Sequence, residues 1–133
     1  MAYWLMRSEP DVFGWDDLVR EGATEWVGVR NYTARNFLQA MAVGDQAFFY
    51  HSRTEKAVVG VMEITRAWRQ DGDDGKWASV AVKPVDKFAK PVTLADIKAE
   101  PKLAKLEMVR QSRLSVTPVR DEEWTLLLAM GAG

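Results

Sequence analysis

The residues best suited to contact a ligand occur together in the stretch Trp26–Leu38, which holds a tryptophan ring, Arg30, Asn31 and Arg35. Asn31 is a favourable N-cap residue, because its side-chain oxygen can accept a hydrogen bond from a backbone N–H group of the first helical turn. The apolar residues repeat with helical spacing and predict a helix from Asn31 to about Met41: Ala34, Phe37, Leu38 and Met41. Arginines beside the positive end of a helix dipole favour an anionic ligand. The same pattern also suits an amphipathic surface helix with solvated arginines.

A catalytic site is harder to assemble from this sequence. Nucleophilic catalysis needs an activated nucleophile beside a base, yet His51 is the only histidine and cysteine is absent. A triad that pairs His51 with Ser8 or Ser52 is an open alternative, although no nucleophile-elbow motif accompanies either serine. A single histidine within an aromatic strand more often has a structural role. We therefore predict that the protein is not an enzyme.

The sequence also predicts no metal and no cofactor. Zinc needs more histidine or cysteine ligands than the chain holds, and neither a P-loop nor a dinucleotide-binding fingerprint occurs. The turn at Asp71–Gly75 is too short for a calcium-binding EF-hand loop. The adjacent carboxylates Asp16–Asp17 and Glu122–Glu123 fall at predicted helix starts, where the helix dipole favours negative charge. We interpret them as capping charges rather than as an acid/base pair.

The length and composition are those of one globular domain spanning residues 1–133. Hydrophobic residues make up 47% of the chain and charged residues 28%, which is enough to bury a core. The segment Met1–Met6 does not have the pattern of a signal peptide, and no apolar run approaches transmembrane length. We expect an intracellular protein, cytoplasmic or, in a eukaryote, nuclear, with no membrane partner, that exists as a monomer.

The net charge of −1 argues against a protein that binds nucleic acid by charge alone. The charges are unevenly distributed, however. Residues 76–113 contain nine lysines or arginines against four aspartates or glutamates, so the remainder of the chain is acidic. This asymmetry permits a basic face on an acidic body, and it equally suits a solvated surface without a binding role.

Tryptophan occurs six times, spread along the whole chain. Most of these rings are expected in the core or at its boundary, because a tryptophan buries a large area and can still satisfy its N–H group at the edge. One or two can line a pocket that stacks a flat ligand. Nucleic-acid bases are recognised by such stacking together with hydrogen bonds at their edges, and phosphates by arginines and backbone amides. The chain thus offers the parts of a base-binding pocket.

Hydrophobic periodicity and turn residues predict about five or six strands and three or four short helices. Gly60 lies within one strand and predicts either a β-bulge or a place where another backbone or a ligand comes close. The predicted strands are residues 3–6, 46–52, 57–69, 77–85 and 114–119. The predicted helices are residues 15–21, Asn31 to about Met41, and one that begins with a capping box at Thr93–Asp96. A final helix is capped by Asp121 and is expected to dock through Trp124, Leu127 and Leu128. The elements do not alternate as in a doubly wound sheet. We predict an α+β fold, a small and partly open β-barrel surrounded by short helices.

Several motifs, in order along the chain, resemble the EVE domain family. They are residues 3–10 (YWLMRSEP), residues 26–38 (WVGVRNYTARNFL), residues 48–52 (FFYHS) and residues 110–116 (RQSRLSV), with Lys76-Trp77 before the last. The resemblance covers essentially the whole chain, and several ordered motifs are far more specific than one short pattern. It implies a PUA-like barrel related to the YTH readers of methylated adenine in RNA.

The family resemblance also implies a function and a set of site residues. EVE domains are regarded as readers of modified bases, chiefly modified cytosine in DNA, with the base flipped into a pocket. The resemblance gives Trp26 the place of the first wall of an aromatic cage, and it sets Ser8 and Glu9 against the base edge. The carboxylate of Glu9 can accept a hydrogen bond from an exocyclic amino group of cytosine or adenine. His51 and Ser52 end a strand that is expected to open into the same pocket.

The same resemblance implies residues at the rim of the pocket. It gives Arg30, Asn31 and Arg35 a role in shaping that rim or in holding phosphates. Arg7 joins them, at a position where the family commonly has a lysine, and the change keeps the charge but alters the geometry of its donors. Arg30, Asn31 and Arg35 lie close to the predicted helix start, whereas Arg7 lies at the end of the first predicted strand.

The second wall of the base pocket is less directly implied. In the YTH readers this wall comes from a region comparable to Arg69–Lys76, and that segment looks shorter here than in animal EVE domains, as does Glu100–Met108. Trp77 is the residue that we expect to supply the wall, with Trp68 as the alternative.

Two other functions stay open beside the expected non-catalytic reader of a modified base in DNA or RNA. The ASCH relatives share the barrel, and some hydrolyse an acyl group from a modified cytidine. Ser8, Glu9 and His51 can imitate the polar triad that such chemistry needs. A protein- or metabolite-binding module would instead use the pocket for a small flat ligand.

Overall fold

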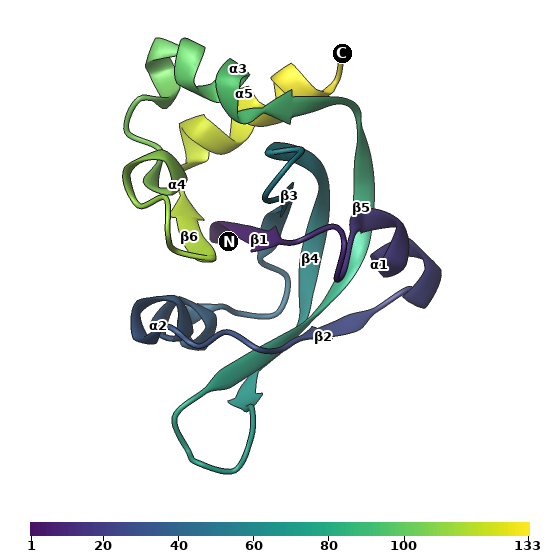
Figure 1. Cartoon of the computed structure of the whole chain (residues 1–133), viewed down its shortest axis with the longest axis vertical. Coiled ribbons are helices and arrows are strands. Elements are labelled where there is room, and N and C mark those ends of the chain that lie inside the picture. The colour runs from purple at the N-terminus through teal and green to yellow at the C-terminus, as the bar shows by residue number, and fades with distance from the viewer.

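The computed structural model describes residues 1–133 and has an α+β fold built on one mixed sheet of six strands. Helices α3, α4 and α5 gather at one end of the molecule, and α2 lies toward the other end (Figure 1). The elements, in chain order, are β1 (Tyr3–Ser8), α1 (Trp15–Glu21), β2 (Thr24–Trp26), α2 (Tyr32–Ala40), β3 (Gln46–His51), β4 (Ala57–Gln70), β5 (Ala78–Thr93), α3 (Leu94–Ala99), the 3₁₀ helix η1 (Pro101–Leu103), α4 (Glu107–Arg110), β6 (Val116–Val119) and α5 (Asp121–Gly131).

The strands follow the order β2-β5-β4-β3-β1-β6 across the sheet. Only β1 and β3 are parallel, and β4 and β5 form the long hairpin that dominates Figure 1. The number of strands lies within the predicted five or six, but the sheet is not closed into a barrel, since β2 and β6 are edges that do not pair. These edges have only three and four residues, and helix α2 contacts both β6 and β5. A helix therefore covers the side where strand pairing would have completed a barrel.

Both faces of the sheet are buried, as the aromatic content of β3 predicts. Its residues alternate between two core clusters. Ala47 and Phe49 pack in a cluster with side chains of α1 and α2, whereas Phe48 and Tyr50 pack in a second cluster with side chains of α5. The sheet is thus held from both sides, and its strand ends are fixed in position.

Short-range sequence patterns predict several local structures correctly. The side chain of Asn31 accepts a hydrogen bond from the backbone N–H of Ala34 at 3.0 Å and caps α2. Gly22 ends α1 with a φ of 77°, in the left-handed region that glycine tolerates. Gly60 is required by close packing, because a Cβ atom there would lie 2.6 Å from the ring of Trp15.

Other local predictions are wrong. Strand β2 was not predicted, since three residues give too little periodicity. Strand β5 extends to Thr93 rather than ending at Val85, because Pro84 lies at a register shift that the sheet accommodates. The N-cap of α5 is Arg120 rather than Asp121, and its backbone N–H donates to the carboxylate of Glu123 at 2.9 Å.

The final helix docks through fewer residues than predicted. Trp124 and Leu127 are buried, but Leu128 is 38% exposed and does not dock. No helix in the structure combines the length and the apolar character needed to cross a membrane.

Candidate functional site

A hollow of about 550 Å³ lies where the C-terminal end of β1 meets the segment around β2. We call it the β1–β2 pocket. Its volume is in the range of small-ligand sites, roughly 300–1,000 Å³. The structure brings together here five residues predicted from the sequence: Arg7, Ser8, Glu9, Trp26 and Arg30.

Trp26 forms a wall of the pocket that is continuous with the core. The ring of Phe49 packs edge-on against the Trp26 ring, with 5.5 Å between the ring centroids and 82° between the ring planes. Trp26 pairs with Val80 in the sheet and is only 8% exposed. The ring is therefore rigidly placed, and it offers a limited apolar surface to a ligand rather than a free-standing plate.

Ser8 and Glu9 supply polar groups at the end of β1. The Ser8 hydroxyl donates to the backbone oxygen of Phe13 at 2.5 Å, which leaves its oxygen free to accept a hydrogen bond. The carboxylate of Glu9 lies 3.1 Å from the guanidinium of Arg53, and its side chain is 44% exposed. Both residues can therefore accept from a ligand, Ser8 from within the pocket and Glu9 from its mouth.

Arg7 ties β1 to the segment that precedes β6. Its guanidinium donates to the backbone oxygens of Ser112 and Leu114, and it lies over the ring of Tyr50, 5.4 Å from the centroid. Burial raises the pKa of the Tyr50 hydroxyl, which the neighbouring Arg7 opposes only in part. The Arg7 Nε atom and the Tyr50 hydroxyl are buried without a hydrogen-bond partner. Arg7 lines the pocket, and its Nη1 atom donates to the protein itself.

His51 and Ser52 do not line the pocket. The Nε2 atom of His51 accepts a hydrogen bond from the backbone N–H of Trp15 at 3.0 Å, and Nδ1 lies 2.6 Å from a carboxylate oxygen of Glu55. A backbone N–H needs an acceptor, so the proton of the neutral ring is on Nδ1. His51 thus supports the first turn of α1, while the backbone N–H of Ser52 donates to Ser8.

Trp77 lies outside the pocket, in a group of side chains that we call the arginine–aromatic cluster: Arg30, Tyr32, Arg35 and Trp77. The rings of Tyr32 and Trp77 stack at 4.9 Å and 25°. The guanidinium of Arg30 lies over Trp77 at 5.4 Å, and that of Arg35 lies over Tyr32 at 4.9 Å. Arg30 belongs to both the cluster and the pocket lining, so the two sites adjoin.

Asp71 fixes the cluster to the pocket rim. Its carboxylate accepts hydrogen bonds from the backbone N–H of Gly28 at 2.9 Å and from Arg30 at 3.0 Å. The Gly28 hydrogen bond and the Arg30 guanidinium together hold the pKa of Asp71 below its usual range. Gly28 has a φ of 84°, in the left-handed region that glycine adopts readily. Its hydrogen bond to Asp71 anchors the loop after β2 to the turn between β4 and β5.

Sequence reasoning missed part of the pocket lining. Four apolar side chains contribute to it, and Glu21, Glu25 and Ser115 add polar groups. Glu25 is paired with Arg66 and with Arg69, the latter at 2.6 Å. Proximity in the fold reveals their role in the pocket. The apolar residues lie within or close to the family motifs, Val27 and Val29 inside residues 26–38 and Val12 and Phe13 just after residues 3–10.

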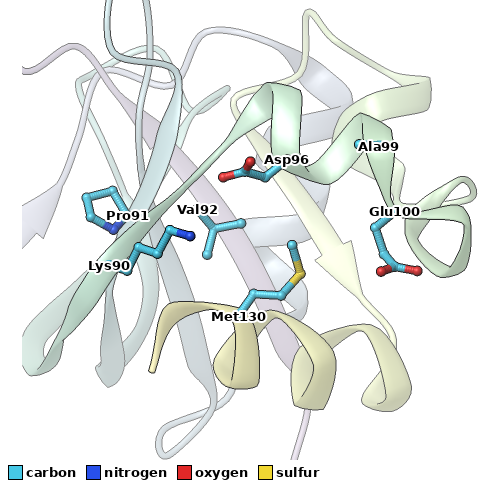
Figure 2. A pocket seen from close by; sticks show the side chains of 7 residues that line it. All are labelled: Lys90, Pro91, Val92, Asp96, Ala99, Glu100 and Met130. Carbon is cyan, nitrogen blue, oxygen red and sulfur yellow. The ribbon is translucent and has the colours of Figure 1, made fainter. Parts of the chain in front are cut away.

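Figure 2 shows a second, smaller hollow of about 310 Å³, lined by side chains from β5, α3 and α5. It holds none of the predicted site residues and no aromatic ring. The carboxylate of Asp96 accepts from the backbone N–H of Thr93 at 3.2 Å and caps α3, so it already has a local role. Nor does any group of three or more potential metal ligands occur in the structure.

The fold and the site together define a small α+β domain whose β1–β2 pocket lies beside an arginine–aromatic surface. The profile of the EVE domain family matches residues 2–130, which is nearly the whole chain. The chain therefore belongs to the EVE domain family. This confirms the resemblance seen in the sequence.

Known proteins match over the same extent. Human thymocyte nuclear protein 1 is 32% identical over 165 residues, covering 97% of this chain and 73% of the relative. The crystal structure of a protein from Agrobacterium tumefaciens has a TM-score of 0.96 at 43% identity, covering 98% of this chain and 93% of the other. The crystal structure of human THYN1 in complex with 5-methylcytosine-containing DNA has a TM-score of 0.91 at 30% identity, covering 100% of this chain and 99% of the other.

Proposed function

We propose that this chain is a non-catalytic DNA-binding module that reads a modified base, with modified cytosine as the main ligand, flipped into the β1–β2 pocket. The observation that carries this proposal is the homologous human protein crystallised with 5-methylcytosine-containing DNA, which matches the whole of this chain at a TM-score of 0.91.

The chemistry of the pocket suits a methylated cytosine. Glu9 and Ser8 offer acceptors for an exocyclic amino group, which cytosine presents at its edge. Apolar contact is what a C5-methyl group requires, and Val12, Val27 and Val29 line the same pocket. Flipping a base out of its stack costs a few kcal/mol. Contact with the Trp26 wall and these hydrogen bonds would recover that cost.

The placement of His51 supports a non-catalytic role over the ASCH-like alternative. An acyl transfer of the kind considered above needs a base within hydrogen-bond reach of the nucleophile. Both ring nitrogens of His51 have other partners, and the Ser8 hydroxyl donates to Phe13 instead. The side chains of Ser8 and His51 form no hydrogen bond with each other.

The test is binding of the purified protein to single-stranded DNA oligonucleotides that differ at one base only. That base is cytosine, 5-methylcytosine, 5-hydroxymethylcytosine or thymine, with RNA versions and N6-methyladenine alongside, measured by fluorescence anisotropy at fixed salt. Thymine is the sharpest comparison, because it keeps the methyl group and replaces the amino group by a carbonyl oxygen. We expect 5-methylcytosine to bind more tightly than both cytosine and thymine.

Glu9→Gln sharpens this experiment, and Glu100→Gln at the second hollow is its matched control. Loss of a charged acceptor should weaken binding of 5-methylcytosine by roughly tenfold, the scale of a hydrogen bond to a charged group. It should also reduce the preference for 5-methylcytosine over thymine, because the amide of the new glutamine can donate a hydrogen bond to the thymine carbonyl. Equal affinity for all bases in the wild-type protein would refute the proposal. Release of cytidine from acetylcytidine would favour the hydrolase instead.

A further inference from the structure

The arginine–aromatic cluster carries an inference about how the nucleic-acid strand is held. We infer that Arg30, Tyr32 and Arg35 bind the sugar–phosphate backbone next to the flipped base, and that Trp77 is a positioning residue for them. This rests on the proposed function, since it concerns the strand that enters the β1–β2 pocket. It assigns to this surface the part of the affinity that does not depend on the base.

The geometry holds the two arginines in place before any ligand arrives. Arg30 lies over Trp77, Trp77 stacks on Tyr32, and Arg35 lies over Tyr32, at separations between 4.9 and 5.4 Å. Guanidinium groups are attracted to aromatic faces at such distances. A side chain held in this way loses less rotamer freedom when it binds a ligand.

The cluster joins two segments that are far apart in the sequence. Arg30, Tyr32 and Arg35 lie at the start of α2, whereas Trp77 lies in the turn between β4 and β5. Arg35 also donates to the backbone oxygen of Lys76 at 2.9 Å, and Asp71 of the same turn holds Arg30. The turn of the long hairpin therefore supports the surface beside the pocket.

The groups that a phosphate would need are unoccupied. Tyr32 is 53% exposed, and its hydroxyl makes no hydrogen bond. The side chain of Arg30 is 47% exposed, and only its Nη1 atom donates, so that Nε and Nη2 are free. Arginine and tyrosine donors of this kind are typical contacts to phosphate oxygens, which position the strand without reading its sequence.

Continuity with the pocket favours a nucleic-acid strand over other anionic partners. Arg30 lines the β1–β2 pocket as well as the cluster, so a strand whose base enters the pocket passes this surface on leaving it. Exposed Lys76 adds a further positive charge, and it makes no ion pair in the structure. Asp71 offsets part of the charge of Arg30. The expected contribution is therefore a few phosphate contacts rather than a strong electrostatic site.

Three variants test the inference in the same anisotropy titrations, each measured at several salt concentrations. Arg30→Gln removes a charge, Tyr32→Phe removes only the free hydroxyl, and Trp77→Leu removes the ring that both neighbours contact. The matched controls are Arg110→Gln, an exposed arginine paired with Glu107, and Tyr3→Phe, whose ring stacks on Trp124. Circular dichroism and urea unfolding confirm that each variant is folded.

We expect Arg30→Gln to weaken methylated and plain oligonucleotides alike and to reduce the slope of log K against log salt by about one. Tyr32→Phe should weaken both about twofold to tenfold, the range of a neutral hydrogen bond. Trp77→Leu should weaken both, and combining it with Arg30→Gln should add little, because the ring acts through the arginine. The two controls should change neither affinity nor slope.

The outcomes separate this inference from the proposed function. If wild-type protein shows no base preference but Arg30→Gln and Tyr32→Phe still weaken all oligonucleotides, the reader proposal fails and the backbone surface stands. Unchanged affinity and salt slope in both variants would overturn the inference. A change confined to the ratio of methylated to plain DNA would overturn it too, since the residues would then read the base. Tighter binding of a phosphoserine peptide than of an oligonucleotide would assign the surface to a protein partner.

Discussion

The β1–β2 pocket and the arginine–aromatic cluster share Arg30 but are built in opposite ways. The pocket takes its shape from the core, since Trp26 is 8% exposed and packs on Phe49. The cluster is exposed, with Tyr32 at 53%, and it is held together by stacking between its own side chains. A buried wall can discriminate between bases of different shape, whereas exposed cations attract any phosphate chain. Selectivity and general affinity are therefore expected to reside in different side chains.

The charges in the two regions follow the same division. Two of the three carboxylates that line the pocket, Glu9 and Glu25, have arginine partners of their own in Arg53 and Arg69. These pairs reduce the repulsion that an approaching phosphate would meet at the pocket mouth. In the cluster the arginines outnumber the one acidic partner, Asp71. Changes in either region can test whether this separation is real.

The largest difference in the free energy of unfolding is expected between variants of two tryptophans. Trp26→Ala should lower the free energy of unfolding by about 3–5 kcal/mol, because it leaves a cavity beside Phe49. Trp77→Ala removes a half-buried ring from one stacked pair and should lower it by only about 1 kcal/mol. Urea unfolding of both variants measures the contrast. Similar losses would mean that Trp77 is as much a part of the core as Trp26.

The next largest loss of stability is expected for Asp45, compared with Asp71. Asp45 is 5% exposed and accepts hydrogen bonds from Ala2 and Ala42 backbone N–H groups and from the Trp4 indole, at 3.0–3.1 Å. Burial acts against its charge, but these donors outweigh burial and lower the pKa of Asp45. Asp45→Asn should therefore reduce the free energy of unfolding by roughly 2–3 kcal/mol at neutral pH.

The same aspartate predicts a pH dependence. The pKa of Asp45 is lower in the folded state than in the unfolded state. The ionised carboxylate therefore stabilises the protein at pH values above the ordinary aspartate pKa of about 4, and this contribution is lost as the pH falls through the pKa of the folded state. Unfolding measured between pH 7 and 3 should show a smaller pH dependence in Asp45→Asn than in wild type. Asp71→Asn should lower the free energy of unfolding by less than about 1 kcal/mol, since the side chain of its partner Arg30 is 47% exposed to solvent. An acid profile of Asp45→Asn identical to wild type would contradict this account.

A smaller effect is expected at His51, which does not line the pocket but pairs with the pocket residue Ser8 between strands β3 and β1. His51→Ala removes the acceptor for the backbone N–H of Trp15 and should lower the free energy of unfolding by about 1–2 kcal/mol. The ratio of affinities for methylated and plain DNA should remain that of wild type. A lost preference in a folded variant would return His51 to the base-binding residues predicted from the sequence.

The smallest effect is expected for Trp68, which is 46% exposed and does not line the pocket. Trp68→Ala should change stability by less than about 0.5 kcal/mol and leave oligonucleotide affinity unaltered in anisotropy titrations. A tenfold loss of affinity would instead make Trp68 the second wall of the base pocket. Trp68 thus serves as the exposed reference for the other tryptophan variants.

The residue order along the chain determined much of the local structure. The cap at Asn31, the glycine that ends α1 and the capping box at Thr93 depend on side chains within four residues of one another, so short-range patterns suffice. The same holds for β3, whose alternating apolar residues predict burial on both faces. Ordered motifs also identified the family, and with it Ser8, Glu9 and Trp26, which the fold places together in one pocket.

Only the tertiary structure decided which residues meet across long sequence separations. Trp77 faces Tyr32 rather than the pocket, and His51 supports Trp15, because hairpin length and strand register set these contacts. The open sheet, the three-residue strand β2 and the passage of β5 through Pro84 depend likewise on pairing with distant strands. Such pairings are fixed by burial and hydrogen bonding of the whole sheet. Local sequence determined the elements, and the packing of those elements determined where each side chain can act.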